Sequence, residues 1–172
     1  WERYDPALSS VDLVLLDLKL ADVERHKVAT GVSNDIILEN ARRIAAWDKP
    51  MWIRTPVIPG YTDDLENIRG IGHFIREWLP AVQRWDLLAY TNLGKPKYHR
   101  LDLPYPLENA VLLTRANMES IWQAAVELVP LSAVVMFNLL GLFRQGIFKV
   151  LDEVPATGGA AAEVHHRLSF GM

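Results

Sequence analysis

Three charged residues follow or interrupt apolar runs, and their types suit the binding of a small charged ligand. Asp17 and Lys19 lie at the end of the apolar run 11–17, and Arg54 lies inside a second apolar run. A carboxylate accepts hydrogen bonds from hydroxyl groups and balances a positive charge, whereas Lys and Arg bind carboxylate groups. Together these types indicate a site for a ligand that carries hydroxyl, cationic and carboxylate groups.

Each of these residues also has a purely structural interpretation. Asp17 and Lys19 lie two positions apart, so on a strand they share a face and can form an ion pair. Arg54 is flanked by apolar residues, and a buried Arg needs an acceptor. Either a salt bridge within the protein or a ligand can supply that acceptor, so the residues alone leave both interpretations open.

The elements that position these residues alternate between strands and helices. Short apolar runs are typical of strands that are buried on both faces, as in parallel sheets. The predicted strands are 11–17, 51–58 and 85–90. Apolar residues at helical spacing predict the helices. The predicted helices are 33–47, 65–79 and 114–128.

Polar residues mark where these helices begin. Ser33 or Asn34 is predicted to accept the free N–H groups of the first helix, Asp63 those of the second, and Thr114 those of the third. His26 is predicted to be a solvated helix residue without a catalytic role. Residues 91–107 are rich in Pro, Gly, Lys and Tyr and predict a long loop, which in an ordered protein is often functional.

Three strand–helix units predict an α/β fold that forms part of a parallel barrel, because three units are too few to close one. Residues 1–130 make up this partial barrel, and residues 131–172 form a tail. The apolar run 131–143 of the tail predicts a buried or partner-docked helix, and it is too short for a convincing membrane span. The chain begins at Trp1 without Met or a signal peptide, so we expect a piece of a longer protein.

The composition narrows the classes of function. The chain has 172 residues, a formal net charge of -3 and no cysteine. The charge does not indicate a nucleic-acid-binding face. The absence of cysteine excludes a disulfide framework and any thiolate-ligated metal within this chain.

Four blocks in a fixed order carry a family resemblance. They are residues 12–19, 31–34, 52–63 and 87–98, and together they span about Val11 to Leu101. This series resembles the second half of pyruvate formate-lyase activating enzyme and of other glycyl-radical-enzyme activases. Four blocks at matching spacing are far more specific than a single motif.

The resemblance implies a partial (β/α) barrel of the radical S-adenosylmethionine (radical SAM) type. Such a fold carries a 4Fe–4S cluster on three cysteines of a CxxxCxxC loop and binds S-adenosylmethionine. The implied activity is formation of a 5′-deoxyadenosyl radical that abstracts hydrogen from a glycine of a partner enzyme. The implied partner is therefore a glycyl radical enzyme, in the cytoplasm, with neither nucleic acid nor membrane involved.

The resemblance also implies which residues touch the cofactor. Asp17, Leu18 and Lys19 correspond to an Asp-Leu-Lys that lies against S-adenosylmethionine. Arg54 corresponds to an Arg that faces the barrel interior near the cofactor. Thr91 stands where the pyruvate formate-lyase type has a cofactor-contacting His, which indicates a subgroup away from that type.

The missing cysteines limit what the chain can do by itself, because a 4Fe–4S cluster needs thiolate ligands. We expect the chain alone to be catalytically silent. Three hypotheses follow: a truncated piece of an activase, a split subunit or scaffold that completes a barrel with a complementary chain, or an ordinary α/β ligand-binding module. They are ranked in that order.

Overall fold

The computed structural model describes residues 5–130 and 133–137. Four strands form one sheet in the order β1-β2-β3-β4, and all neighbouring strands are parallel. The strands are β1 Val14–Asp17, β2 Met51–Val57, β3 Val82–Ala89 and β4 Val134–Phe137. The helices are α1 Asp5–Ser9, α2 Val23–Thr30, α3 Asp35–Ala45, α4 Leu65–Trp78, the 3₁₀ turn η1 Asn92–Gly94, α5 Lys95–Arg100 and α6 Arg115–Val126. The predicted parallel α/β fold is confirmed.

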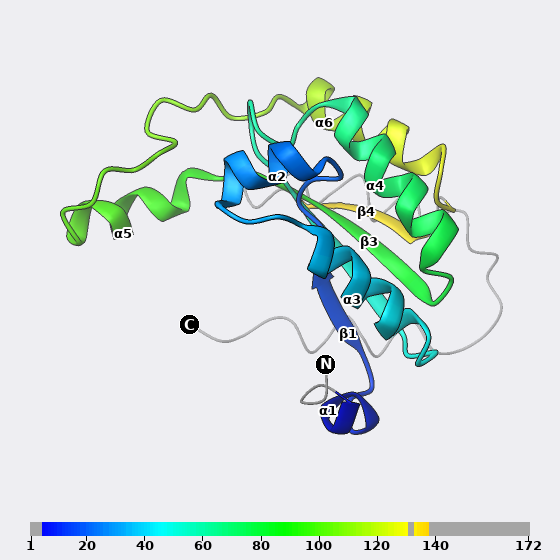
Figure 1. The fold of residues 1–172 in the computed structure, drawn as a ribbon. Helices are drawn as coiled ribbons and strands as arrows, with labels where there is room; N and C mark the ends of the chain where they lie inside the picture. Colours follow the sequence, from blue (N-terminus) through cyan, green and yellow to red (C-terminus); the bar gives the residue numbers. More distant parts are fainter. Residues whose placement is uncertain (1–4, 131–132, 138–172) are drawn as a thin grey trace, which may run out of the picture.

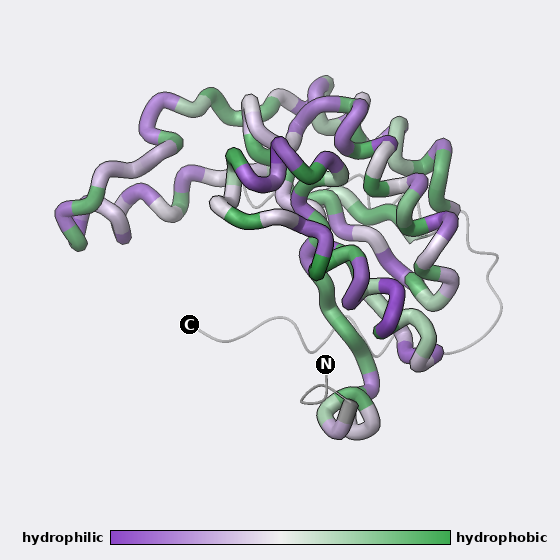
Figure 2. The backbone as a smooth tube through the Cα atoms, viewed as in Figure 1, coloured by the Kyte–Doolittle hydropathy of each residue, from purple (hydrophilic) through white to green (hydrophobic). Residues whose placement is uncertain are grey.

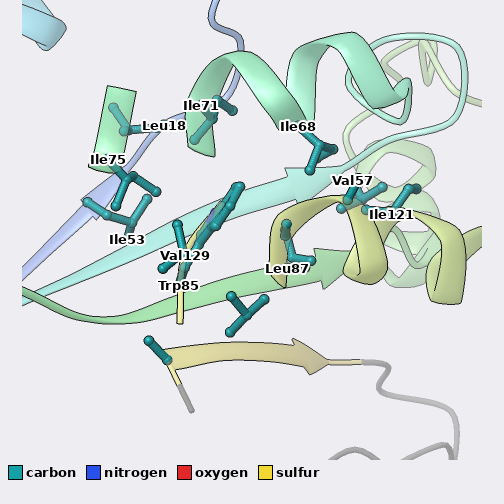
Figure 3. Close-up of a cluster of buried hydrophobic side chains, with 14 of the residues drawn as sticks. Leu18, Ile53, Val57, Ile68, Ile71, Ile75, Trp85, Leu87, Ile121 and Val129 are labelled. Carbon is teal, nitrogen blue, oxygen red and sulfur yellow. The ribbon is translucent and has the colours of Figure 1, made fainter. Parts of the chain in front are cut away.

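One face of the sheet packs against α3, α4 and α6, which lie together on that side (Figure 1). Alternate residues of β2 are fully buried on this face, including Met51, Ile53 and Val57. They meet Ile68, Ile71 and Ile75 of α4 and Met118, Ile121 and Ala125 of α6 in one apolar cluster (Figure 3). In Figure 2 the tube of β1 is apolar, whereas α3 alternates between polar and apolar residues, as an amphipathic helix must.

The fourth strand corrects the prediction for the tail. The apolar run from 131 predicts a helix, but Val134–Phe137 forms a strand that pairs with β3, with Trp85 opposite Val134. Two β-branched residues begin this strand, and its backbone groups are satisfied by the edge of β3. The rest of the predicted tail, 138–172, lies outside the described residues, and the boundary at residue 130 stays a prediction.

Two further segments differ from the prediction. The predicted loop 91–107 contains η1 and the helix α5. The bounds of the helix α2 were not predicted, and its His26 is buried rather than solvated, with Nδ1 2.7 Å from the carbonyl oxygen of Val32. α2 has a weak apolar stripe, so the sequence pattern alone does not reveal it. Among the described residues, no helix has the length and apolar character needed to cross a membrane.

The predicted helix starts are partly confirmed. Thr114 caps α6 in a reciprocal capping box with Asn117. The Ser33 hydroxyl accepts the Asp35 N–H at 3.1 Å at the start of α3. The cap of α4 is Asp64 rather than the predicted Asp63, which instead accepts the Gly60 N–H at 2.8 Å within the preceding turn.

Candidate functional site

The face of the sheet opposite the helices carries a row of charged side chains. Asp17 of β1 lies opposite Arg54 of β2, and Arg54 lies opposite Asp86 of β3. The Arg54 Nε donates to Asp17 Oδ1 at 2.8 Å, and the two side chains are 40% and 42% exposed. Asp17 therefore supplies an acceptor for Arg54 within the protein, across two neighbouring strands.

A second ion pair continues this row, and the sequence prediction missed it. Arg84 Nε donates to Asp86 Oδ1 at 2.6 Å, and the Arg84 guanidinium lies 4.4 Å from the ring centroid of Trp52. Asp86 is 5% exposed, and this burial raises its pKa, while Arg84 opposes the rise. The alternation of 84, 86 and 88 along β3 is the signal that could have placed both residues on the charged face.

The residues after β1 point to opposite sides. Leu18 is 3% exposed and lies in the apolar core, near the isoleucines of α4 (Figure 3). Its N–H donates to the Arg54 carbonyl at 3.0 Å, and its own carbonyl accepts from the Thr55 hydroxyl at 2.8 Å. The side chain of Lys19 is exposed. Leu18 therefore fixes the backbone from which Asp17 and Lys19 project.

Thr91 is not brought together with the other predicted site residues. It follows β3 in an extended conformation and precedes η1 without a side-chain capping bond. Asp86 is the residue level with Asp17 and Arg54, and Thr91 lies five residues beyond it, about 16 Å at the usual rise of a strand. Thr91 is also in phase with Trp85, Leu87 and Ala89, which face the helices rather than the charged row.

Beyond Thr91, residues 92–112 form an arm that stands away from the sheet (Figure 1). None of these residues is buried. Glu108 accepts from Lys95 at 3.1 Å and lies 3.2 Å from His99, and the hydroxyls of Tyr90 and Tyr105 are 2.8 Å apart. The exposed large apolar residues of the arm are Leu93, Leu101, Leu103, Val111 and Leu112.

The turn between β2 and α4 is tied to α2 at the same edge of the sheet. Arg25 donates to both carboxylate oxygens of Asp64 and to the Tyr61 carbonyl at 3.0 Å. The hydrogen bond from Arg25 holds the pKa of Asp64 below its usual range, and burial opposes this effect. Asp64 also accepts the Asn67 N–H at 2.9 Å, so one carboxylate caps α4 and anchors α2.

The donor set at this edge fits S-adenosylmethionine and does not fit an iron–sulfur cluster. A carboxylate at Asp17 suits ribose hydroxyls or the sulfonium charge, and the cations at Lys19 and Arg54 suit the carboxylate of an amino acid. Ligands of parallel α/β folds bind at the carboxyl ends of the strands. The chain has no cysteine, and no group of three metal-ligating side chains occurs among the residues that the structure describes.

The fold class follows from solved structures. A domain of a pyruvate-formate lyase-activating enzyme from Bacteroides vulgatus superposes with a TM-score of 0.61 and 24% identity, covering 80% of this chain and 74% of that chain. A radical SAM methyltransferase from Sphaerobacter thermophilus gives a TM-score of 0.56 at 12% identity, covering 79% and 37%. The chain therefore has the fold of a radical SAM enzyme domain.

Sequence comparison shows which enzymes of this fold the chain is related to. The chain is homologous to pyruvate formate-lyase-activating enzymes. It is 41% identical to the one from Streptococcus mutans over 107 residues, 62% of this chain and 40% of the relative. It is 36% identical to the (2S)-3-sulfopropanediol dehydratase activating enzyme of Klebsiella oxytoca over 126 residues, 73% and 40%. No family model matches. The chain spans about two fifths of the length of these curated relatives.

Proposed function

We propose that this chain is the carboxyl-terminal part of a radical SAM activase that installs a glycyl radical in a partner enzyme. The observation that carries the proposal is the Asp17–Arg54 pair, which sits with Lys19 at the edge of a parallel sheet in a chain homologous to such activases. Two relatives that are 41% and 36% identical to this chain over the matched residues are named as activating enzymes of pyruvate formate-lyase and of a sulfopropanediol dehydratase. The proposed substrate is accordingly a glycyl radical enzyme.

In this proposal the residues after β1 hold the cofactor. Asp17 and Lys19 bind the polar groups of S-adenosylmethionine, Leu18 supports them from the core, and Arg54 keeps the Asp17 carboxylate in place. Thr91, about 16 Å along the chain beyond the level of Asp17 and Arg54, is not part of this group. When bound, S-adenosylmethionine would supply a 5′-deoxyadenosyl radical by one-electron cleavage of its C5′–S bond, with methionine as the leaving group.

The cluster that delivers this electron has no ligands here. We propose that its three cysteines lie in a part of the protein outside this chain, because the relatives are more than twice as long as the matched region. The contribution proposed for this chain is to bind and orient S-adenosylmethionine.

An electron paramagnetic resonance experiment tests this function. The protein that combines this sequence with the cluster cysteines is reconstituted with iron and sulfide under anaerobic conditions and reduced. We expect a 4Fe–4S signal that changes when S-adenosylmethionine is added, and a glycyl radical doublet when a partner enzyme is present. A cluster signal that S-adenosylmethionine leaves unchanged would contradict the proposal.

A matched pair of variants makes the test specific. Asp17→Asn should weaken or abolish the change in the cluster signal. Asp12→Asn removes the same charge from an exposed residue two positions before β1, and it should leave that change intact. Equal effects of the two substitutions would show that overall charge, rather than a site at the end of β1, governs binding.

A further inference from the structure

The segment that follows β1, residues 18–21, has no regular secondary structure, yet buried side chains donate hydrogen bonds to all four of its carbonyls. Asn67 of α4 is 2% exposed. Its Oδ1 accepts the Ala21 N–H at 2.8 Å, and its Nδ2 donates to the Lys19 carbonyl at 3.1 Å. Nδ2 also donates at 3.1 Å to the Thr62 carbonyl, in the turn before α4. One amide therefore joins the segment to that turn.

A second buried asparagine holds the other side of the segment. Asn34, which precedes α3, is 1% exposed. Its Nδ2 donates to the Leu20 carbonyl at 2.8 Å and to the Ala21 carbonyl at 3.2 Å. With the bond from Thr55 to Leu18, all four carbonyls of residues 18–21 accept from buried side chains.

Neither asparagine uses its side chain to cap its own helix. Asn34 occupies the N-cap position of α3, where an asparagine oxygen usually accepts a backbone N–H, but it makes no such bond. Its Oδ1 is instead buried without a partner within the described part of the chain. Asn67 lies in the first turn of α4, whose cap is Asp64. Leaving a buried polar atom unpaired destabilises the fold. The hydrogen bonds that Asn34 donates to the segment 18–21 therefore offset the free-energy cost of its unpaired Oδ1.

From these contacts we infer that Asn34 and Asn67 are positioning residues, which fix residues 18–21 so that Asp17 and Lys19 present their side chains to the cofactor. The inference rests on the proposed function. An amide suits the task because it offers two donors and an acceptor, whereas a carboxylate lacks the donors. Pre-positioned binding groups lose less conformational freedom when a ligand binds. The clamp that Asn34 and Asn67 form around residues 18–21 should therefore increase the affinity for S-adenosylmethionine without touching it.

Amide hydrogen exchange of the full 172-residue chain, measured by NMR, tests the clamp directly. In Asn67→Ala the Ala21 N–H loses its acceptor, so its exchange should accelerate at least about tenfold. The Leu18 N–H, which donates to the Arg54 carbonyl, provides an internal control, and its exchange should accelerate less than that of Ala21. Unchanged exchange at Ala21, or equal acceleration at both amides, would overturn the inference.

Binding of S-adenosylmethionine to the cluster-bearing protein tests the consequence. Asn67→Ala should raise the dissociation constant about tenfold while the cluster signal persists. Thr114→Ala removes the cap of α6, whose bonds are to Asn117 and not to residues 18–21, and controls for a general loss of stability. It should lower the unfolding midpoint but leave the dissociation constant unchanged.

The outcomes separate the two proposals. Faster exchange at Ala21 with unchanged affinity would overturn the positioning role, and so would an equal loss of affinity in Thr114→Ala. If the unsubstituted protein binds no S-adenosylmethionine, the proposed function fails. The exchange experiment on the chain alone then still decides whether Asn67 fixes the segment.

Discussion

Two segments leave the same edge of the sheet and are built in opposite ways. Residues 18–21 follow β1 and are held by buried side chains, chiefly Asn34 and Asn67. The arm, residues 92–112, follows β3 and contains no buried residue. The first segment has one backbone geometry imposed by the core, whereas the arm is held by contacts between its own exposed side chains. A fixed segment suits a small cofactor, and an exposed one leaves its apolar residues accessible.

The largest expected effect comes from breaking the fixed segment. Asn67→Ala leaves the Ala21 N–H and two carbonyls without their partner, so we expect a loss of about 2 to 4 kcal/mol in the free energy of unfolding. Urea denaturation measures this loss. In the arm, Glu108→Gln weakens the contacts to Lys95 and His99 and should change stability much less. Similar losses in both variants would contradict the contrast between the segments.

Two glycines give a second test of the same contrast. A Cβ on Gly70 of α4 would lie 2.6 Å from the Cβ of Ala21, too close without a shift of the segment. Overpacking of this kind costs about 1 to 3 kcal/mol. It exceeds the gain of about 0.8 kcal/mol that Ala has over Gly in a helix. Gly70→Ala should therefore lower the unfolding midpoint.

Gly94 at the start of α5 is the matched position in the arm. A Cβ there would lie 3.5 Å from the Tyr105 hydroxyl, an ordinary contact, and the backbone has a negative φ of -72°. Gly94→Ala should leave the thermal unfolding midpoint unchanged or raise it slightly. A larger loss in Gly94→Ala than in Gly70→Ala would show that the arm is the more tightly packed segment.

A pH series tests how α2 and α4 support the fixed segment. The pKa of Asp64 is held low by Arg25, so this pair stabilises the fold fully above about pH 4 and stops doing so as pH falls through the lowered pKa. Asp64→Asn keeps a capping oxygen but loses the ion pair. Because both side chains are about 40% exposed, we expect a loss below about 1 kcal/mol at pH 7. Urea denaturation should show this difference shrinking toward pH 3, and a difference independent of pH would contradict the pairing.

The smallest expected effect concerns the base of the arm. The hydrogen bond with Tyr90 and partial burial raise the pKa of Tyr105 to about 12. Tyr90→Phe should lower this pKa toward the usual value near 10, which an ultraviolet absorbance titration measures. The neutral Tyr105 stabilises the fold below pH 10, and this contribution is lost as pH rises toward 12. The control Tyr61→Phe alters an exposed tyrosine elsewhere and should not change the titration of Tyr105.

The sequence predicted those parts of the fold that local pattern determines. Three strands and three helices follow from apolar periodicity, and Thr114 follows from capping chemistry. The strand β4 was not predictable, because residues 134–137 take that conformation by pairing with β3, which is about fifty residues away in sequence. His26 was predicted to be solvated, yet its burial depends on a hydrogen bond to the Val32 carbonyl.

The candidate site, like the fold, was predictable from the sequence only in part. Asp17, Lys19 and Arg54 were predicted from residue type and family resemblance, but the pairing of Asp17 with Arg54 depends on the register of β1 and β2. Asn67 gave no signal in the sequence, because an asparagine in the first turn of a helix is unremarkable. Only the path of residues 18–21 over α4 shows what its amide does.

The measurement that tests the account most directly is the dissociation constant of S-adenosylmethionine for the reduced, cluster-bearing protein, determined by equilibrium dialysis. We expect Asp17→Ala to raise this constant at least about tenfold, since a charge-assisted hydrogen bond contributes about 1.5 to 3 kcal/mol. Asp12→Ala, two residues before β1, should leave it unchanged. Equal constants for the unsubstituted protein and Asp17→Ala would remove Asp17 from the site and contradict the central claim.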